Sequence, residues 1–526
     1  MLIDKRNFLS GSIDGDLILK INIGGQDAWS NDVLVLYLAD ITNNYVVITT
    51  DVETTKVNWG DGSISEGTVS PTDATLRRFE HTYNFGASQN IACVIYGCKY
   101  FEGISVAPRP VGFFIGQSLL GIRRESLIGF RMNNLIIPNN VTLIGMGALH
   151  GCSFLESLTL PFVGTVAGVS SESNYQYPIG YIFGESSYTG GQQTIQNYYI
   201  SPHDTRSDSY YIPSSLTNVT VTGGHILYGA FWGCVNFSSI NIGSGVLSVS
   251  PYAFCGCAGL QNINVSNNNQ TYKSVNGNLY SKNGQTFILC PANKTGEISI
   301  SNSVINIGDI AFQNCINITS ITIPVGVTNI GSSAFSGCES LINIIVPDSV
   351  ITVGANAFAN CPIQNAIIPA LVAPYIKNDE LESVEITSGD ALENSAFLSC
   401  ASLMSVTLPD TLTSIGTNAF RGCTALTNIS LPDNIIRIGD GAFAYCSGLS
   451  GIIMGDNIEE LGVGAFVNCT GFNSITIRAT TPPTLANEYV FNNTNNCPIY
   501  VPSSSVNAYK TATYWSALAT RIQAIN

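Results

Sequence analysis

Between about residues 109 and 484, apolar and polar positions recur with a fixed period. The clearest marker is the motif Ala-Phe-x-x-Cys, whose cysteines stand 23 residues apart within each of two runs: Cys315, Cys338 and Cys361, then Cys400, Cys423, Cys446 and Cys469. Such a period is typical of a solenoid, in which each coil buries its apolar face only against its neighbours. The pattern therefore predicts a stack of coils of about 23 residues.

One short strand is predicted in each coil. At Ile429-Ser430-Leu431 the alternation sends Ile429 and Leu431 inward and Ser430 outward, and Pro432 ends the strand. The outward positions of the coils are largely polar and none is aromatic: Thr322, Ile345, Glu385, Thr407, Ser430 and Thr476. They predict a broad sheet surface of low relief, suited to contact with a large partner.

The repeat is interrupted twice. Cys257 and Cys315 are 58 residues apart, and the segment between them predicts a small β-hairpin insert. Cys152 and Cys234 are 82 residues apart. The longer segment carries the candidate recognition residues, namely Tyr175, Tyr177, Tyr181, Tyr188, Tyr198, Tyr199, His203, Asp204, Tyr210 and Tyr211.

Two interpretations of this tyrosine-rich insertion stand side by side. Insertions in solenoids emerge on one face, often the binding face, and tyrosine supplies rigid amphipathic contact area. In the alternative, the tyrosines only pack a long loop onto its own coil. Binding of a glycan and binding of a protein are both open.

The full coil carries a recognisable sequence motif. Leu403 to Pro409 follows Leu-x-x-Ile-x-Leu-Pro with Val406 at the isoleucine position, and Ile415-Gly416 and Ala419-Phe420-x-x-Cys423 complete the coil. This pattern closely resembles the BspA-type leucine-rich repeat. The resemblance implies a right-handed solenoid with one short parallel strand per coil, and most often a cell-surface adhesin.

The chain before the repeats has a different pattern. Residues 1–44 alternate apolar and polar at Leu17–Ile23 and Val33–Tyr37, which predicts strands and a segment for attachment. Residues 45–108 contain Trp59-Gly60-Asp61-Gly62 and Phe79-Glu80-His81-Thr82-Tyr83. This order resembles a PKD-type immunoglobulin-like domain and implies an antiparallel β-sandwich. A calcium site at Asp61 is disfavoured, because one carboxylate beside two glycines offers too few ligands.

Residues 485–526 are predicted to cap the solenoid, whose repeats fill residues 109–484. Apolar side chains recur at nearly helical spacing, and Ser504 or Ser505 can serve as the N-cap. The helix would cover the last coil and shield its strand edge, with Trp515 in the core. The apolar series is Val506, Tyr509, Ala512, Trp515, Leu518 and Ile522.

Composition narrows the function classes. The 526 residues are 45% hydrophobic and 11% charged, and the net charge of −15 disfavours nucleic acid as a partner. The apolar run Val111–Ile122 is broken by glycines and too short to cross a bilayer. The amino terminus lacks the pattern of a secretory signal peptide.

The fifteen cysteines are expected to be free thiols. Most stand at one phase of the repeat, where stacked side chains run parallel about 4.8 Å apart instead of converging as a disulfide requires. They are therefore interpreted as an interior ladder of small apolar side chains, not as disulfides or metal ligands. No catalytic motif and no cofactor motif is evident, so we expect no enzymatic activity and no catalytic, cofactor or metal residues.

Two hypotheses for function remain. In the first, the protein is a bacteriophage virion appendage on the virion surface, whose N-terminal region binds other virion proteins while the solenoid binds a host-surface protein or glycan. In the second, it is a BspA-like adhesin of the bacterial cell surface. The missing signal peptide and anchor favour the first hypothesis. A homo-oligomer is one open alternative in both.

Overall fold

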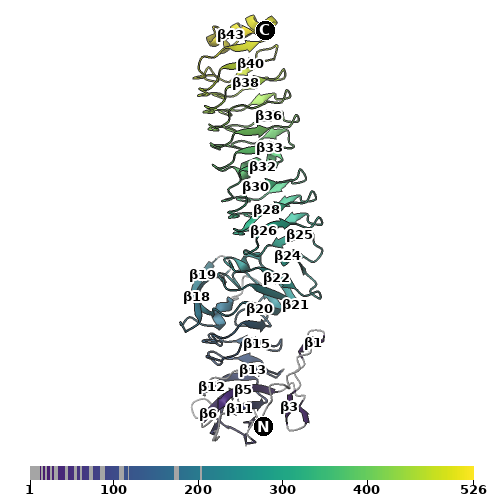
Figure 1. Ribbon diagram of the computed structural model, residues 1–526, viewed down its shortest axis with the longest axis vertical. Coiled ribbons are helices and arrows are strands. Elements are labelled where there is room, and N and C mark those ends of the chain that lie inside the picture. Colours follow the sequence, from purple (N-terminus) through teal and green to yellow (C-terminus); the bar gives the residue numbers. More distant parts are fainter. Residues whose placement is uncertain are drawn as a thin grey trace. The chain divides into compact units, whose positions relative to one another are not determined.

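A computed structural model describes residues 12–13, 16–17, 21–23, 26–28, 33–41, 45–51, 56–59, 62–69, 75–82, 89–105, 112–116, 118–170, 177–201 and 204–525. The chain forms two compact units, Met1–Lys282 and Asn283–Asn526. Strands dominate both (Figure 1). In the described part of the chain, no helix has the length and apolar character needed to span a bilayer.

The first unit begins with two small sheets of mainly antiparallel strands. One has the order β13 (Gly112–Ile115), β5 (Val33–Ile41), β11 (Gln89–Tyr96), β7 (Lys56–Asn58) and β8 (Ile64–Ser65). The other contains β12 (Tyr100–Ser105), β6 (Tyr45–Asp51), β10 (Leu76–Thr82) and β9 (Thr68–Val69). Two further hairpins are β1 (Ser12–Ile13) with β2 (Asp16–Leu17), and β3 (Ile21–Ile23) with β4 (Gln26–Ala28).

Trp59 joins the two sheets. Its ring, fully buried after β7, stacks on the ring of His81 in β10 with centroids 5.0 Å apart, and its Nε1 donates to Ser65 Oγ at 2.8 Å. The two motif segments that suggested a PKD-type domain therefore meet. Asp61 and Tyr83 lie outside the described residues, and the PKD-like assignment stays a prediction. So does the division at residues 44 and 108, although β5 pairs with strands on both sides of it.

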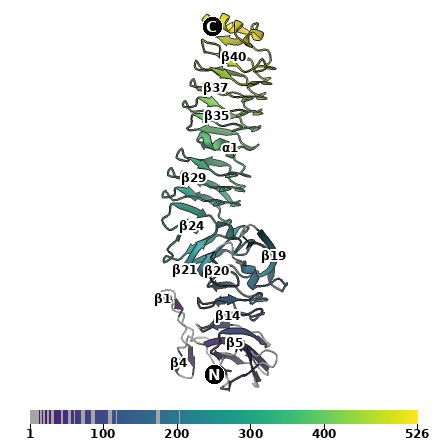
Figure 2. The same cartoon turned by 180° about the vertical axis from the view of Figure 1, so that it is seen from behind.

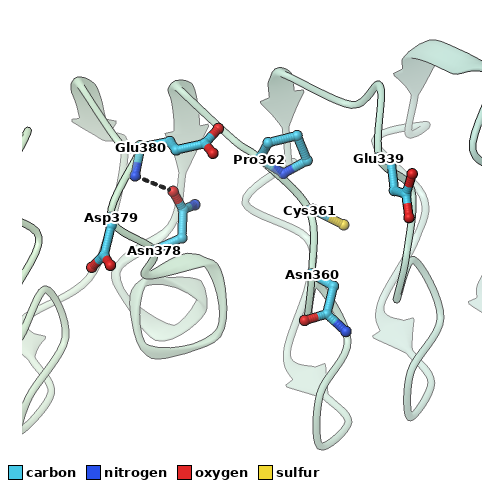
Figure 3. Close-up of a pocket in the computed structure, with 7 residues that line it drawn as sticks. All are labelled: Glu339, Asn360, Cys361, Pro362, Asn378, Asp379 and Glu380. Carbon is cyan, nitrogen blue, oxygen red and sulfur yellow. Dashed lines mark hydrogen bonds between the residues drawn. The ribbon is translucent and has the colours of Figure 1, made fainter.

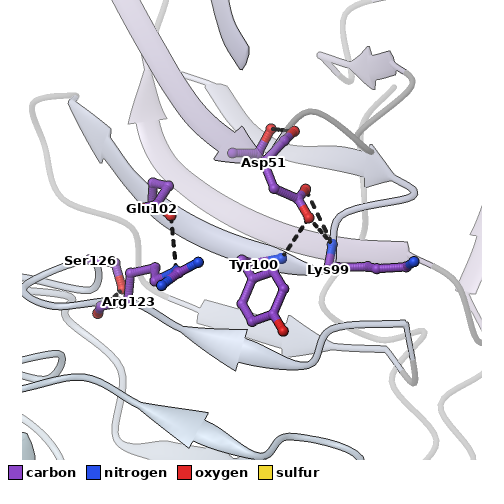
Figure 4. Close-up of polar contacts among 7 residues, drawn as sticks. Asp51, Lys99, Tyr100, Glu102, Arg123 and Ser126 are labelled. Carbon is purple, nitrogen blue, oxygen red and sulfur yellow. Dashed lines mark hydrogen bonds and ion pairs between the residues drawn. The ribbon is translucent and has the colours of Figure 1, made fainter. Parts of the chain in front are cut away.

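The solenoid continues directly from the second of these sheets. Strand β12 pairs in parallel with β14 (Gly121–Ile122), which pairs in parallel with β16 (Leu143–Ile144). Figure 4 shows the polar contacts at this junction, where the Asp51 carboxylate accepts the backbone N–H groups of Lys99 and Tyr100 at 3.2–3.3 Å. Arg123 pairs with Glu102 at 3.1 Å, so the first coil is tied to the sheet by charge as well.

The coils of the first unit build one parallel sheet. Its order is β15 (Asn134–Ile136), β17 (Ser157–Leu160), β20 (Asn218–Ile226), β21 (Ser239–Val249) and β22 (Asn262–Val265). The hairpin insert predicted between Cys257 and Cys315 is present as β23 (Tyr272–Val275) and β24 (Asn278–Ser281), which are antiparallel.

Most coils of the second unit contribute two strands. One series of strands, paired from coil to coil, is called here the longer strands. It consists of β26 (Gly296–Ser299), β28 (Ile318–Thr322), β30 (Asn343–Ile345), β32 (Asn365–Ile368), β33 (Ser383–Ile386) and β35 (Ser405–Thr407), then β38 (Gly451–Met454), β40 (Ser474–Ile477) and β42 (Ile499–Val501). The shorter ones form β25 (Thr286–Leu289), β27 (Asn306–Ile307), β29 (Asn329–Ile330) and β31 (Thr352–Val353), then β34 (Ala391–Leu392), β36 (Ser414–Ile415), β37 (Arg437–Ile438), β39 (Glu460–Leu461) and β41 (Thr484–Leu485). All the pairs between successive coils are parallel, which confirms the predicted solenoid.

Phenylalanine and cysteine fill the coil interior at fixed positions. The rings of Phe420 and Phe443 stack with centroids 5.1 Å apart, and Phe443 and Phe466 repeat the contact at 5.3 Å. All fifteen cysteines are free, and the repeat cysteines are buried, as predicted. Burial of these aromatic rings and thiols supplies the apolar contact area between coils.

The residue before each of these cysteines adopts a left-handed backbone. Gly337 has φ +76° and Asn360 has φ +58°, residue types that tolerate this region best. At the same place Tyr445 has φ +62°, and its ring lies 4.8 Å below the Arg421 guanidinium. The turn geometry therefore explains why glycine and asparagine are the commonest residues at this position.

The coil at Ile429-Ser430-Leu431 departs from the prediction. Burial alternates as expected, with Ile429 and Leu431 inside and Ser430 exposed, but these residues form no strand. The longer strands therefore fall into two sheets, one ending at β35 and one beginning at β38. The alternation of apolar and polar residues correctly predicted which side chains face inward. It did not predict that the backbone pairing that defines a strand is missing here.

One coil of the second unit is shorter than its neighbours. Asn343 pairs with Asn365, 22 residues later, but Asn365 pairs with Ser383, only 18 residues later. Here η4 (Ala370–Val372) and the helix α1 (Ala373–Ile376) replace the second strand and the Ala-Phe turn (Figure 2). The column of shorter strands consequently stops at β31 and resumes at β34.

The C-terminal cap is helical only in part. Helix α2 covers Val506–Thr511 and η6 covers Trp515–Leu518, and Tyr514 between them has φ +63°. Ser505 takes the N-cap position without a side-chain hydrogen bond. The predicted helical cap is confirmed, although its helical part is divided into these two short segments and β43 (Ile522–Ala524) adds to β42 as a further parallel strand.

Trp515 is a core residue, as predicted. Its side chain is 1% exposed, and Nε1 donates to the Pro483 carbonyl at 2.8 Å. Tyr509 is buried beside it and donates its hydroxyl to the Ala479 carbonyl at 2.8 Å. The cap thus closes the interior of the last coil.

Candidate functional site

The tyrosine-rich insertion consists of one irregular coil and a long hairpin. The segment around η2 (Ile179–Ile182) takes the place of an Ala-Phe turn, because Leu149 N donates to Ile182 O and Ile179 N donates to Ala230 O. The hairpin follows as β18 (Gly191–Ser201) paired with β19 (Asp204–Pro213). The break between Cys152 and Cys234 is therefore a coil without its cysteine plus an inserted hairpin.

Gln196 fixes the hairpin to the solenoid. Its side chain is fully buried, and its Oε1 accepts from Gly180 N at 2.7 Å. Its Nε2 donates to the Trp232 carbonyl at 2.8 Å. One amide therefore satisfies a donor on η2 and an acceptor on the next coil. Gln196 was not among the residues predicted from the sequence.

Two of the candidate tyrosines lie inside the insertion. Tyr198 and Tyr210 are each 1% exposed, and both hydroxyls point to Asp208 Oδ2, at 2.5 and 3.5 Å. Arg206 Nε pairs with the same carboxylate at 2.8 Å. Burial, reinforced by the Asp208 carboxylate, raises the pKa of Tyr198 to about 12. These two rings pack the hairpin, as the alternative interpretation proposed.

Tyr188 is also held in place. Its hydroxyl donates to the Tyr211 carbonyl at 2.9 Å, and its ring meets the ring of His150 edge-on with centroids 5.0 Å apart. Burial raises the pKa of Tyr188 well above its ordinary value. This ring therefore connects the hairpin to the preceding coil.

The remaining described candidates reach the surface to different degrees. Tyr177 and Tyr181 are partly exposed and stack with centroids 4.2 Å apart, and burial raises the pKa of Tyr181. Tyr199 and Tyr211 are also partly exposed, and Asp204 is exposed. Tyr175 and His203 lie outside the described residues. Recognition by this insertion stays a prediction, now restricted to its accessible side chains.

Tyr199 belongs to a row of aromatic rings that extends beyond the insertion. Its centroid lies 4.4 Å from that of Tyr228, and Tyr228 lies 5.7 Å from Trp232 and 5.8 Å from Tyr252. We call Tyr199, Tyr228, Trp232 and Tyr252 the aromatic row. Its last three members were not among the predicted site residues, although Tyr-Gly-Ala-Phe-Trp at residues 228–232 marks an unusual version of the repeat turn.

The outward strand positions form a second accessible surface. Thr322, Ile345, Glu385 and Thr407 are exposed, with Ile345 at 59%. Successive coils bring these positions together, since Thr322 pairs with Ile345 and Glu385 pairs with Thr407. The prediction that these four strand positions face outward is confirmed.

The short coil of the second unit leaves a hollow of about 450 Å³ (Figure 3). Three of its seven lining residues carry carboxylates, but the described residues contain no group of three or more His, Cys, Asp or Glu side chains able to hold a metal ion. Asn378 is occupied within the fold, because its side chain bonds the Ile363 and Ile376 carbonyls and accepts from Glu380 N. The lining residues are Glu339, Asn360, Cys361, Pro362, Asn378, Asp379 and Glu380.

Most repeat thiols have a raised pKa, and the exception is Cys361, whose pKa is lowered by a hydrogen bond with the Cys338 side chain. Burial raises the pKa of Cys152 and of Cys446 to about 12 and that of Cys400 to about 11. These thiols remain protonated at neutral pH, and only the thiolate is a strong nucleophile or metal ligand. Their role is structural.

A family described as "BspA type Leucine rich repeat region" matches in six copies over residues 113–198, 205–295, 283–379 and 390–517. Among curated proteins, none matches the chain. The family match spans more than half of the chain's residues.

Solved structures of bacterial proteins resemble parts of the chain. A leucine-rich repeat protein from Bacteroides ovatus is 22% identical, with 78% of this chain and 88% of that chain covered and a TM-score of 0.45. One from Eubacterium ventriosum is 24% identical, with 60% and 82% covered and a TM-score of 0.38. A leucine rich cell surface protein from Faecalibacterium prausnitzii is 20% identical, with 76% and 88% covered and a TM-score of 0.26. On the strength of the family match, the chain belongs to the BspA-type leucine-rich repeat family.

Proposed function

We propose that the protein is a non-enzymatic recognition protein of a bacterial cell surface, which adheres to a protein or glycan on a host or neighbouring cell. The observation that carries this proposal is the accessible face of the parallel strands in the second unit, together with the hairpin inserted into the first unit. Such surfaces suit contact with large partners. A non-enzymatic role is further supported by family membership and by the buried, protonated thiols.

Family membership favours the cell-surface hypothesis over the virion hypothesis. The virion hypothesis depended on the missing signal peptide and the missing anchor. The absence of these two features supports no conclusion about the origin of the protein. The family match gives it no support. We therefore adopt the adhesin hypothesis that the sequence analysis held as its alternative.

The proposal is tested with beads coated with the purified protein and incubated with cultured epithelial cells and with bacteria. We expect saturable attachment that soluble protein competes away. A Glu385→Arg/Thr407→Arg variant tests the strand face, and a Tyr199→Ser/Tyr211→Ser variant tests the hairpin. Loss of attachment in one variant locates the contact.

Location is tested separately on intact cells that produce the protein. Added protease should release solenoid fragments into the medium. Full protection from protease, or beads that attach to no cell type, would contradict the proposal.

A further inference from the structure

The inserted hairpin has two edges, and the solenoid covers one of them. A Cβ added to Gly229 would lie 1.8 Å from the carbonyl oxygen of Asn197, and one added to Gly233 would lie 2.8 Å from that of Ile195. The edge of β18 therefore lies directly against the coil turn that contains these two glycines. Because the sheet has only two strands, β19 forms the opposite edge, and both strands lie at the side of the coils (Figure 1 and Figure 2).

Two hydrogen bonds identify the backbone groups that point to the edge of β19. Ser214 N donates to Gly190 O at 2.8 Å and so continues the pairing with β18, whereas Tyr211 N donates to Gly184 O at 3.0 Å, outside the hairpin. Successive residues of an antiparallel strand direct their N–H and C=O groups to alternate edges. Even-numbered residues of β19 therefore bond β18, and odd-numbered residues point their backbone groups outward.

The middle of this edge is open in the part of the chain that the structure describes. There, the outward N–H groups of Thr205, Ser207 and Ser209 donate to no backbone carbonyl, and residues 204–207 are exposed. The pairing with β18 runs without a bulge from Thr205 to Pro213. A strand edge without a bulge or an interior proline is a template for another strand.

We propose that β19 pairs with β19 of a second copy of this chain, in antiparallel orientation about a two-fold axis at Ser207. In this register Arg206 of each copy lies opposite Asp208 of the other, so that two pairs of opposite charges face each other. The Arg206 side chain is 56% exposed and lies 2.8 Å from its own Asp208. Because residues 206 and 208 share one face of the strand, the second carboxylate would reach the same guanidinium.

The order of charges along β19 selects this register. An axis at Arg206 would place Arg206 against itself and Asp204 against Asp208, so that every opposed pair carries like charges. An axis at Thr205 would pair Asp204 with Arg206, but the paired length would shrink because β19 begins at Asp204. An axis at Ser207 keeps residues 205–209 paired and opposes only unlike charges. The edge therefore matches a copy of itself.

This dimer adds to the proposed function without depending on it. The pairing uses the edge of the hairpin and leaves the strand face of the second unit to other partners. Two linked copies would hold a surface with greater avidity than one copy.

The first test measures the mass of the full chain in solution by sedimentation equilibrium, from about 1 µM to about 300 µM. We expect monomers to convert to dimers within this range. Ser207→Pro should weaken the dimer at least tenfold, because it removes the N–H groups at the centre of the pairing, about two hydrogen bonds in all. Proline is tolerated on an edge whose N–H points away from the sheet. Ser207→Ala keeps the N–H group and should dimerise within about threefold of the parent.

A second variant tests the charges. Arg206→Glu opposes like charges in the dimer and should weaken it by about tenfold. Arg131→Glu makes the same change of charge at an exposed residue of another coil and should alter the dimer by less than about threefold. Far-ultraviolet circular dichroism of each variant checks the β structure.

Cross-linking tests the register. Directly opposed residues of a hydrogen-bonded antiparallel pair have Cα atoms about 5.5 Å apart, within the range that a disulfide bridges. Oxidation with diamide should therefore link two chains of a Ser207→Cys variant. Thr205→Cys should not link to itself, since residue 205 lies opposite residue 209 of the second copy. The parent chain, treated in the same way, controls for its own cysteines, of which Cys255 is only partly buried.

Each outcome decides the proposal. A chain that stays monomeric up to about 300 µM overturns it. A dimer that Ser207→Pro and Arg206→Glu leave intact, or one that cross-links through residue 205 and not through residue 207, also overturns it. A dimer lost in both variants and linked at residue 207 supports it, whether or not beads coated with the protein attach to cells.

Discussion

The thiol of Cys446 donates a hydrogen bond to the carbonyl oxygen of Phe420, one coil earlier, at 3.0 Å. The same carbonyl accepts the backbone N–H of Cys423 at 3.1 Å. Cys361 and Phe335 repeat the relationship at 3.0 Å. Cysteine is therefore both a small apolar filler and a polar link between coils.

Replacing Cys446 by alanine should lower stability by about 1–2 kcal/mol. The variant loses a hydrogen bond, removes the sulfur from a filled interior and leaves one lone pair of the Phe420 oxygen unpartnered. Urea unfolding followed by circular dichroism measures the loss. Cys255→Ala is the matched control, since Cys255 is only partly buried, and equal losses in the two variants would contradict the role given to the hydrogen bond.

Alkaline pH should destabilise the protein through the same thiols. Burial raises the pKa of Cys152, Cys257 and Cys446 from the ordinary value of about 9 to about 12 in the folded state. Between pH 9 and pH 12 the unfolded chain has lost protons that the folded chain retains, so stability falls as pH rises. Each such thiol contributes a slope of about 1.4 kcal/mol per pH unit in that window.

The measurement is urea unfolding from neutral pH to about pH 11, with reducing agent present. Cys152→Ala should unfold with a shallower dependence on pH than the parent. Buried tyrosines such as Tyr198 add to the slope, because burial raises the pKa of that side chain too. A stability that stays constant or rises across the window would be incompatible with protonated buried thiols.

Gly416 should not tolerate alanine. A Cβ at this position would lie 2.7 Å from the backbone nitrogen of Asn394 in the preceding coil, which cannot move away without breaking the stack. We expect a loss of about 2 kcal/mol or more, in the range for overpacking. Gly326→Ala is the control, because its nearest neighbour would be the Val304 carbonyl at 3.6 Å, and its thermal unfolding midpoint should stay near the parent value.

Gln196→Ala should loosen the hairpin while the solenoid stays folded. It leaves the Gly180 N–H and the Trp232 carbonyl without their buried partner, at a cost of about 2–4 kcal/mol to the local structure. Hydrogen exchange of residues 191–213 should accelerate. Gln193→Ala is the control, because Gln193 is exposed on the same strand. Unchanged protection in Gln196→Ala would show that other contacts hold the hairpin.

The repeat determined most of what the sequence could predict. Alternation at positions such as Ser430 and the phase of Phe420 and Cys423 identify the inward side chains, because each coil meets an equivalent coil. The short coil with α1 was not foreseen, since Pro369 to Ile376 carries neither the Ile-Gly nor the Ala-Phe signal. The division of the helical cap was not foreseen either, because the apolar spacing from Val506 to Ile522 gives no sign of the left-handed backbone at Tyr514.

The site was predictable only in outline. Counting residues between Cys152 and Cys234 located the insertion, and its tyrosines drew attention to it. The sequence could not distinguish Tyr198, which is buried against Asp208, from Tyr199, which joins the surface row. Adjacent strand residues face opposite sides of the hairpin. The side that faces the solenoid is set by the hydrogen bonds of Gln196 to Gly180 and Trp232, which are distant in sequence.

The short coil also has a mechanical consequence for the second unit. A load applied along a stack of coils is shared by every ladder that links one coil to the next. Where α1 replaces a strand, the ladder of shorter strands is interrupted between β31 and β34, and only the ladder from β32 to β33 spans the gap. The coil at Ile429–Leu431 is likewise spanned by one ladder, the two-residue pairings of β37 with β36 and β39. Under tension we expect the second unit to lengthen first at these two places, before its other coils unravel.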